Sequence, residues 1–411
     1  MALAVAMGIG RFAFTPLLPM MLHDGVIDLQ GGSWLATANY FGYLVGALLC
    51  TFQPWIWRQA PSLPAVDAPW MVRAGLVATA LLTLGMALPW PRAWPTLRFA
   101  AGVASAFVFV YTSGWCLALL ARRNATRIGG AMFTGPGIGI VVSGLAASAL
   151  VAAAQHATTG WLMFGGLAVV LTIAVWRIFR DDPNAHAPTP PVAVAAATAG
   201  PRGTWPGQSP PAAVHGRAEV AWLAFAYGLA GFGYIVTATF LPVIARAALP
   251  GSPWLDLFWP VVGVGVIAGA LLATRLKVTI DLRLLLVGCY LVQALGVALS
   301  AWWPTLSGFV LGSFLLGIPF TAITFFAMQE VRLVRPTLVA STMGLLTALY
   351  GIGQIVGPPV VAWILRGSAS TGAGFTLALE VAAATLVLGA AIFAAMCRLW
   401  PKPRAPRAAA V

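Results

Sequence analysis

Arg11 is the side chain whose type and position most directly suggest chemistry. It is a cation in the middle of residues 1–21, an otherwise apolar stretch of the length that crosses a bilayer, which takes roughly 20 residues. An arginine at that depth costs about 2.5–3.5 kcal/mol on insertion, so it usually faces a protein interior or a water-filled cavity and has a partner. No Asp or Glu lies at matching depth in a stretch expected to line a cavity. An anionic substrate could therefore be the partner of Arg11; backbone carbonyls, Asn39 or tyrosines are the alternative.

Other polar side chains lie at helical spacing in the apolar stretches. Thr15 shares a helix face with Arg11, and small or polar residues on one face of a membrane helix mark close packing or a cavity. Arg98 lies near one end of its stretch, so a side chain that reaches water is an equally good interpretation. For the remaining residues, hydrogen bonds to a ligand and hydrogen bonds between helices are both open. We predict a substrate-binding set made of Arg11, Thr15, Asn39, Tyr43, Arg98, Thr112, Tyr227, Tyr234, Tyr350 and Gln354.

Two carboxyl groups are candidates for proton coupling, because a carboxyl group in a low-dielectric environment can exchange a proton near neutral pH. Glu380 lies well inside an apolar stretch, where a structural pairing or a dimer contact is the alternative. Glu330 lies near Arg332, and a salt bridge at the membrane surface is favoured over proton coupling.

Motifs for other chemistry are absent from the sequence. Cysteines and histidines are scattered singly without metal-ligand spacing, so we predict neither a metal site nor a cofactor. No GxxxxGK[ST] phosphate-binding loop occurs, so ATP is not the direct energy source. The apolar stretches hold no central histidine, almost no acids and no HExxH motif, which argues against a membrane-embedded enzyme.

The composition is that of an integral membrane protein. Only 8% of residues are charged and 60% are hydrophobic, with a mean hydropathy of +0.90, whereas soluble domains carry about 25% charged residues. The apolar runs are continuous rather than alternating, which indicates an all-α membrane protein and not a barrel. We predict twelve transmembrane helices at residues 1–21, 33–53, 70–89, 96–119, 128–154, 160–179, 219–241, 256–274, 283–302, 305–329, 339–365 and 374–397.

The basic residues define the orientation. If the N-terminus is cytoplasmic, eighteen Arg and Lys residues fall on the cytoplasmic side and three on the other side, which predicts that both termini are cytoplasmic. The net charge of +13 therefore reflects topology and not nucleic-acid binding. The excess of Arg over Lys, with abundant Ala and Gly, is typical of GC-rich bacteria, so we predict the inner membrane of a bacterium. Residues 1–21 lack the basic start and cleavage site of a signal peptide, and their abrupt apolar beginning suggests a start codon slightly upstream.

The two halves of the chain repeat each other. Gly42-x-x-x-Gly46-Ala-Leu-Leu recurs as Gly265-x-x-x-Gly269-Ala-Leu-Leu, and the displacement of 223 residues also relates Gly8-x-Gly10 to Gly231-x-Gly233. Each unit contains an even number of spans, so both enter the membrane in the same direction and form a parallel repeat. We predict two six-helix bundles at 1–179 and 217–398, a flexible linker at 180–216 and a basic tail at 399–411.

This organisation resembles the major facilitator superfamily (MFS) over nearly the whole chain. Arg98-x-x-x-Gly102 is similar to the arginine motif of that superfamily's fourth helix, and the chain looks most like its bacterial YbfB/YjiJ-type subfamily. The loop after the second span lacks the usual Gly-x-x-x-Asp-Arg/Lys motif. The resemblance implies a substrate site near the midplane between the bundles, so we expect Arg11 in the cleft between them.

Gly-Pro pairs occur at matching places in the two halves. Gly135-Pro136 in the fifth span resembles a motif of antiporters in that superfamily, and Gly357-Pro358 echoes it in the eleventh. Proline removes a backbone donor, so we expect a bend at each pair, with an ordinary tolerated kink as the alternative.

These observations predict a secondary active transporter of a small organic solute, with an anion as the class that Arg11 suggests. We expect alternating access, proton coupling, a monomer, and efflux by antiport slightly favoured over the alternative, uptake of an organic anion by proton symport. A non-transporting solute sensor is a further alternative, although the linker and tail are short for an output domain.

Overall fold

The computed structural model describes residues 1–59, 67–122, 131–179, 216–252, 254–275, 281–335 and 338–401. Within these ranges, twelve segments are helical, long and apolar enough to cross a membrane, and each coincides with one of the predicted spans. The predicted all-α membrane fold is therefore confirmed. The helices of the first half are η1 (Ala4–Phe12), α1 (Phe14–His23), α2 (Leu29–Gln59), α3 (Ala68–Gly85), α4 (Trp94–Arg122), α5 (Thr134–Ala152) and α6 (Ala157–Trp176).

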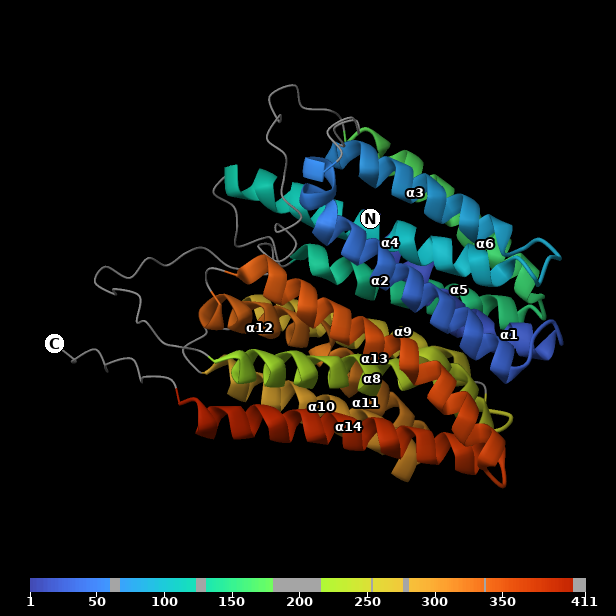
Figure 1. The fold of residues 1–411 in the computed structure, drawn as a ribbon. Coiled ribbons are helices and arrows are strands. Elements are labelled where there is room, and N and C mark those ends of the chain that lie inside the picture. Colours follow the sequence, from blue (N-terminus) through green and yellow to red (C-terminus); the bar gives the residue numbers. More distant parts are fainter. Residues whose placement is uncertain are drawn as a thin grey trace.

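The second half of the chain repeats this arrangement. In Figure 1 the helices of the first half (blue to green) lie on one side and those of the second half (yellow to red) on the other, all running in roughly one direction. We call the end at which α6 finishes and α8 begins the linker end. The helices of the second half are α8 (Arg217–Ala248), η3 (Leu255–Leu257), α9 (Phe258–Arg275), α10 (Leu282–Trp302), α11 (Leu306–Gly317), α12 (Pro319–Val334), α13 (Val339–Gly367) and α14 (Thr371–Leu399).

The repeated glycines have equivalent packing roles in the two halves. A β-carbon at Gly42 in α2 would collide with the carbonyl oxygen of Phe99 in α4. Its repeat counterpart Gly265 in α9 meets the carbonyl oxygen of Phe314 in α11 in the same way. Small residues let membrane helices approach backbone to backbone, which explains why the sequence repeat is strongest at these positions.

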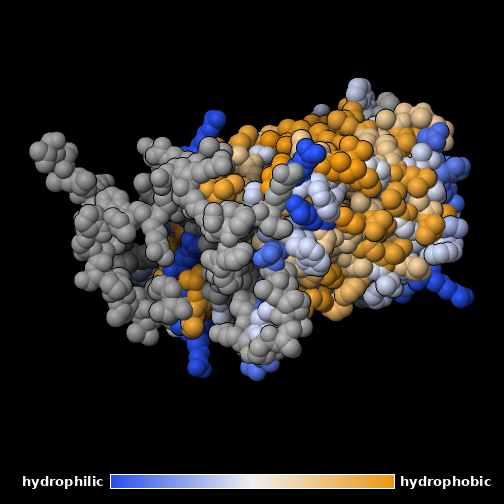
Figure 2. All heavy atoms as spheres, turned by 90° about the horizontal axis from the view of Figure 1, so that it is seen from above, coloured by the Kyte–Doolittle hydropathy of each residue, from blue (hydrophilic) through white to orange (hydrophobic). Residues whose placement is uncertain are grey.

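The outer surface is apolar, as a lipid environment requires. Large side chains point outward from the spans, among them Ile173 in α6 with 68% of its surface exposed and Trp363 in α13 with 70%. Figure 2 shows hydrophobic residues over the middle of the molecule, with hydrophilic residues gathered at the end away from the grey segments. This distribution matches a bilayer-spanning body with a polar face at that end.

Two spans depart from simple helices. The first begins as a π-helix, Ala4–Phe12, and continues as α1, and all residues of the π-helical part are buried. The tenth is divided into α11 and α12 at Ile318, where Pro319 supplies no backbone N–H for the helix to continue. Hydropathy cannot distinguish such interruptions from a continuous helix, because the residues on both sides are equally apolar.

The Gly-Pro pairs occupy unequal positions, which corrects the expectation of a bend in both spans. Pro136 is the third residue of α5, in its first turn, where the missing N–H has no partner to lose. Pro358 lies well inside α13 and is followed by Pro359, so the eleventh span loses backbone bonds there. Most of the predicted linker (180–215) and tail (402–411) lies outside the described residues.

Candidate functional site

Arg11 lies between the two halves and is enclosed by both. Its Nη2 donates a hydrogen bond of 2.6 Å to Oε1 of Gln354 in α13. The face of its guanidinium lies over the ring of Tyr43 in α2, 4.2 Å from the ring centre. Only 3% of Arg11 is exposed, so it does not face an open cleft as the sequence led us to expect. The structure shows the two halves closed around this cation.

Gln354 connects the repeat counterparts of the two halves. Its Nε2 donates to the hydroxyl of Tyr234, which stands in α8 at the position that corresponds to Arg11. Tyr234 in turn stacks on Tyr350, with ring centres 5.8 Å apart, and Tyr350 stacks on Tyr227 at 4.8 Å. The amide side chain therefore joins the cation of the first half to a row of tyrosines in the second.

The electrostatic balance at Arg11 leaves room for an anion. No described carboxylate lies within ion-pair distance of it. Its Nε has no hydrogen-bond partner among the described residues, although the atom is buried. Nε and Nη2 form the edge of the guanidinium that a carboxylate grips with two parallel bonds. Gln354 accepts a hydrogen bond from Nη2 only, so one of the two donors on that edge of Arg11, Nε, is unused.

Three side chains of the first half hold the backbone that carries Arg11. Arg98 in α4 donates to the carbonyl oxygens of Gly10 at 3.2 Å and Arg11 at 3.3 Å. Asn39 donates to the carbonyl oxygens of Gly10 at 3.5 Å and Arg98 at 2.9 Å, and Ser105 donates to that of Ala6. Wide π-helical turns are rare and occur mostly at functional sites, and here neighbouring side chains satisfy their carbonyls. Arg98 is only 2% exposed. The interpretation of its side chain as one that reaches water at the end of the span is therefore wrong.

The predicted substrate-binding set therefore divides into groups. Arg11, Tyr43, Tyr227, Tyr234, Tyr350 and Gln354 come together between the halves. Asn39 and Arg98 support the π-helix instead. Thr15 donates to the carbonyl oxygen of Ala238 in α8 at 2.7 Å, which is a contact between the halves. The hydroxyl of Thr112 is buried in α4 without a hydrogen-bond partner among the described residues.

The two candidate proton-coupling residues have different surroundings. Glu330 in α12 is fully buried, with Oε1 3.4 Å from Nε of Arg283 in α10. The same guanidinium lies 3.5 Å from Glu219 in α8 and 3.3 Å from Asp281, so Glu330 belongs to a buried ion-pair cluster and not to a salt bridge at the membrane surface. Glu380 accepts a hydrogen bond of 3.1 Å from the indole of Trp302, away from the interface between the halves.

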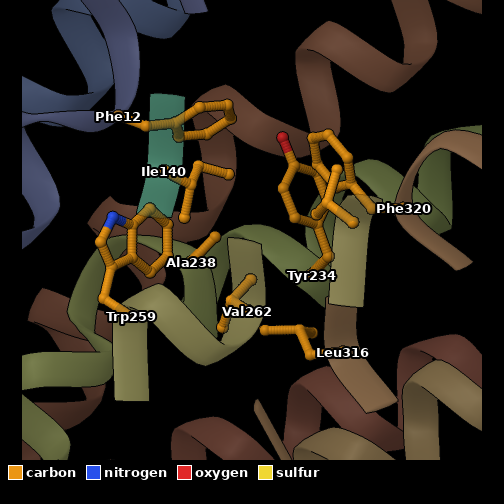
Figure 3. A pocket seen from close by; sticks show the side chains of 9 residues that line it. Phe12, Ile140, Tyr234, Ala238, Trp259, Val262, Leu316 and Phe320 are labelled. Atoms are coloured by element: carbon orange, nitrogen blue, oxygen red, sulfur yellow. The ribbon is translucent and has the colours of Figure 1, made fainter. Parts of the chain in front are cut away.

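Sequence reasoning missed an apolar pocket beside Arg11. Phe12 and Ile140 of the first half line it together with Tyr234, Trp259, Val262 and Phe320 of the second. Figure 3 shows Phe12, Ile140 and Trp259 on one side and Tyr234 and Phe320 on the other. It has room for about one water molecule. Apolar residues are abundant throughout the chain, so nothing in the sequence singled these out.

Comparison with known proteins places the chain among membrane transporters. Residues 3–394 match the model of a family described as uncharacterised MFS-type transporter YbfB. The crystal structure of the nucleoside transporter NupG superimposes with a TM-score of 0.63 at 17% identity, covering 96% of this chain and 99% of that one. The human organic anion transporter MFSD10 (TETRAN) gives a TM-score of 0.58 at 14% identity, covering 95% and 98%. No curated protein matches the sequence.

Proposed function

Because the chain belongs to the family of MFS-type transporters described as YbfB, we propose that it is a secondary active transporter of a small organic anion, with Arg11 as the anion-binding group. The observation that carries this proposal is the bond between Arg11 and Gln354, which is made across the interface of the two halves. A neutral amide is a weaker partner for a guanidinium than a carboxylate. An anion that enters between the halves therefore displaces Gln354 and takes the whole Nε–Nη2 edge.

We propose alternating access, which the contacts between the halves support. Thr15 donates to Ala238, and Tyr40 shares a hydrogen bond of 2.8 Å with Thr239, both between the first half and α8. These contacts lie along the part of α8 beyond Tyr234, toward the end opposite the linker end. Opening on that side must break them, and opening toward the linker end leaves them in place. Either movement releases Arg11 from Gln354.

The energy source that we propose is the proton gradient, with antiport favoured over symport. The antiport preference rests on the resemblance of the Gly135-Pro136 pair to an antiporter motif. Of the two carboxyl candidates, Glu330 is the better supported, because it is buried beside Arg283 and lies on α12, the helix that also supplies Phe320 to the pocket. Glu380 bonds to an indole at the rim of the second half and is the weaker candidate. We place the protein in a bacterial inner membrane as a monomer with cytoplasmic termini, following the distribution of basic residues.

Flux into proteoliposomes tests the proposal. Purified protein is reconstituted and given benzoate, succinate or neutral glycerol, with and without an imposed pH gradient. We expect gradient-driven flux of an anion but not of glycerol, and its direction relative to the gradient separates antiport from symport. Arg11→Ala should abolish that flux. The control is Arg366→Gln, which removes an exposed arginine from the helix that carries Gln354. Unchanged anion flux and apparent affinity in Arg11→Ala would refute the role of Arg11.

A solute sensor is the second candidate, since the same closed site could bind an anion without moving it. Binding of the anion in detergent without flux in proteoliposomes would favour it.

A further inference from the structure

The apolar pocket beside Arg11 borders the proposed anion site. Phe12 follows Arg11 in the chain and turns its ring into the pocket. Tyr234 lines the pocket as well, and its hydroxyl bonds to Gln354, the partner of Arg11. One side chain on each half therefore belongs both to the pocket and to the surroundings of the cation. A molecule bound to Arg11 has this pocket as its immediate neighbour.

The lining of the pocket is suited to hydrocarbon. Tyr234 and Trp259 carry the polar atoms among the lining residues, and in Figure 3 the indole nitrogen of Trp259 lies on the side away from Tyr234 and Phe320. The ring centre of Phe12 is 6.0 Å from that of Trp259 and 6.0 Å from that of Phe320. No basic side chain lines the pocket, so a second anionic group placed there would be buried without a counter-charge, which is costly.

We infer that the substrate is a hydrophobic monocarboxylate, whose carboxylate replaces Gln354 at Arg11 and whose aryl or branched alkyl body fills this pocket. The inference rests on the proposed function and adds the substrate class. Dicarboxylates and sugar phosphates are excluded, because they would place charge or many hydroxyls against Phe12, Trp259 and Phe320.

The present size of the pocket ties occupancy to the movement of the halves. Its room for about one water is too small for an aryl ring. Phe12 and Ile140 belong to the first half, whereas Trp259 and Val262 belong to the second. Separation of the halves therefore widens the pocket at the same time as it frees Arg11. The aryl or alkyl part of a bound substrate would then stabilise the widened state.

The test compares acids that share a carboxylate and differ in their body. Apparent affinities for transport in proteoliposomes are measured for benzoate, acetate and succinate. We expect benzoate to be favoured over acetate by at least about tenfold, as for apolar groups in fitted pockets, and succinate not to compete. Equal affinities for benzoate and acetate, or tighter binding of succinate, would overturn the inference while leaving anion transport intact. A folded protein that moves no anion would overturn the proposed function with it.

Two variants of α9 and a matched control locate the effect. Val262→Phe directs a ring into the space that benzoate would occupy in the widened state, and should weaken benzoate by about tenfold while leaving acetate unchanged. Val264→Phe adds the same ring two residues away, at a position that is 48% exposed toward lipid, and should behave as the unmodified protein. Val266→Ala enlarges the pocket and should shift the preference from benzoate toward naphthoate, which keeps the inference testable if Val262→Phe does not fold. Equal weakening of benzoate and acetate by Val262→Phe, or no shift in Val266→Ala, would overturn it.

Discussion

Arg11 Nη2 lies 2.6 Å from Oε1 of Gln354, although the two residues are 343 positions apart and belong to different halves of the repeat. In the closed arrangement Gln354 occupies the Arg11 donor that the proposed substrate anion would need. Breaking it leaves a buried guanidinium without its oxygen, so the closed state needs either Gln354 or an anion at this place.

The first prediction concerns the charge at position 354. Gln354→Glu places a carboxylate against Arg11, which adds the attraction of opposite charges to the hydrogen bond that the neutral amide already accepts. We expect the melting temperature in detergent to rise and the apparent affinity for the transported anion to fall by about tenfold or more. Gln354→Ala removes the competitor, so anion binding should stay equal or tighten while the closed state loses stability. Wild-type anion affinity in Gln354→Glu would show that the anion does not take the place of Gln354.

The second prediction concerns the support of the π-helix. Arg98→Leu removes hydrogen bonds to the carbonyl oxygens of Gly10 and Arg11 and leaves both acceptors buried. Hydrogen bonds from a charged donor contribute about 1.5–3 kcal/mol each, so we expect a clear loss of thermal stability. Anion affinity should fall as well, since the backbone that carries Arg11 is no longer held. Thermal unfolding of purified protein and anion flux measure the two effects.

A matched variant separates support from simple burial. Leu97→Ala changes the neighbouring position in α4, whose side chain packs against Gly85 of α3 and has no polar atom that could hold the carbonyls of η1. It should cost stability without changing anion affinity. If Arg98→Leu also leaves the affinity unchanged, the π-helix does not position Arg11.

Much of the fold follows from composition, whereas the site follows only in part. The twelve spans and the parallel repeat are expressed in runs of residues, and the glycines at 42 and 265 confirm the repeat through equivalent contacts. Arg11 stands out because a lone cation in an apolar helix is costly. Its partner Gln354 shares no local pattern with it, so only the packing of α13 against the first half reveals the pair.

Two interpretations failed for the same physical reason. The position of Arg98 suggested a side chain that reaches water at the membrane surface, and Pro136 suggested a bend inside the fifth span. Sequence gives the depth of a residue along its own helix but not the tilt of neighbouring helices or the residue at which a helix starts. Arg98 meets the π-helical carbonyls because α4 passes beside η1, and α5 begins only at Thr134.

The third prediction concerns the buried ion-pair cluster at the linker end. Arg283→Met leaves the carboxylates of Glu219 and Glu330 buried without that guanidinium, and removal of one partner from such a cluster costs about 3–5 kcal/mol. We expect a large fall in melting temperature. Arg283→Met combined with Glu219→Gln and Glu330→Gln should restore part of the melting temperature, because the triple variant removes the buried carboxylate charges together with the cation. Equal instability of the single and triple variants would show that Arg283 acts through packing alone.

The fourth prediction concerns acid stability at the opposite end, where Asp24 joins the end of α1 to the start of α6. Burial raises the pKa of Asp24, but the N–H of Ala157 at 2.7 Å and the His156 ring at 3.0 Å outweigh it, so the pKa lies below its ordinary value. A lowered pKa in the folded state means that this carboxylate stabilises the fold above its unfolded pKa of about 3.9. That contribution is lost as the pH falls through the lower, folded value.

Asp24→Asn should therefore lower the melting temperature at pH 7 and reduce its fall between about pH 5 and pH 3. Asp67→Asn is the control, because Asp67 is exposed at the start of α3 and its side chain makes no capping hydrogen bond. The measurement is thermal unfolding in detergent across that pH range. A steeper acid transition in Asp24→Asn than in the unmodified protein would mean that the carboxylate opposes the fold at neutral pH, contrary to the contacts that it makes with α6.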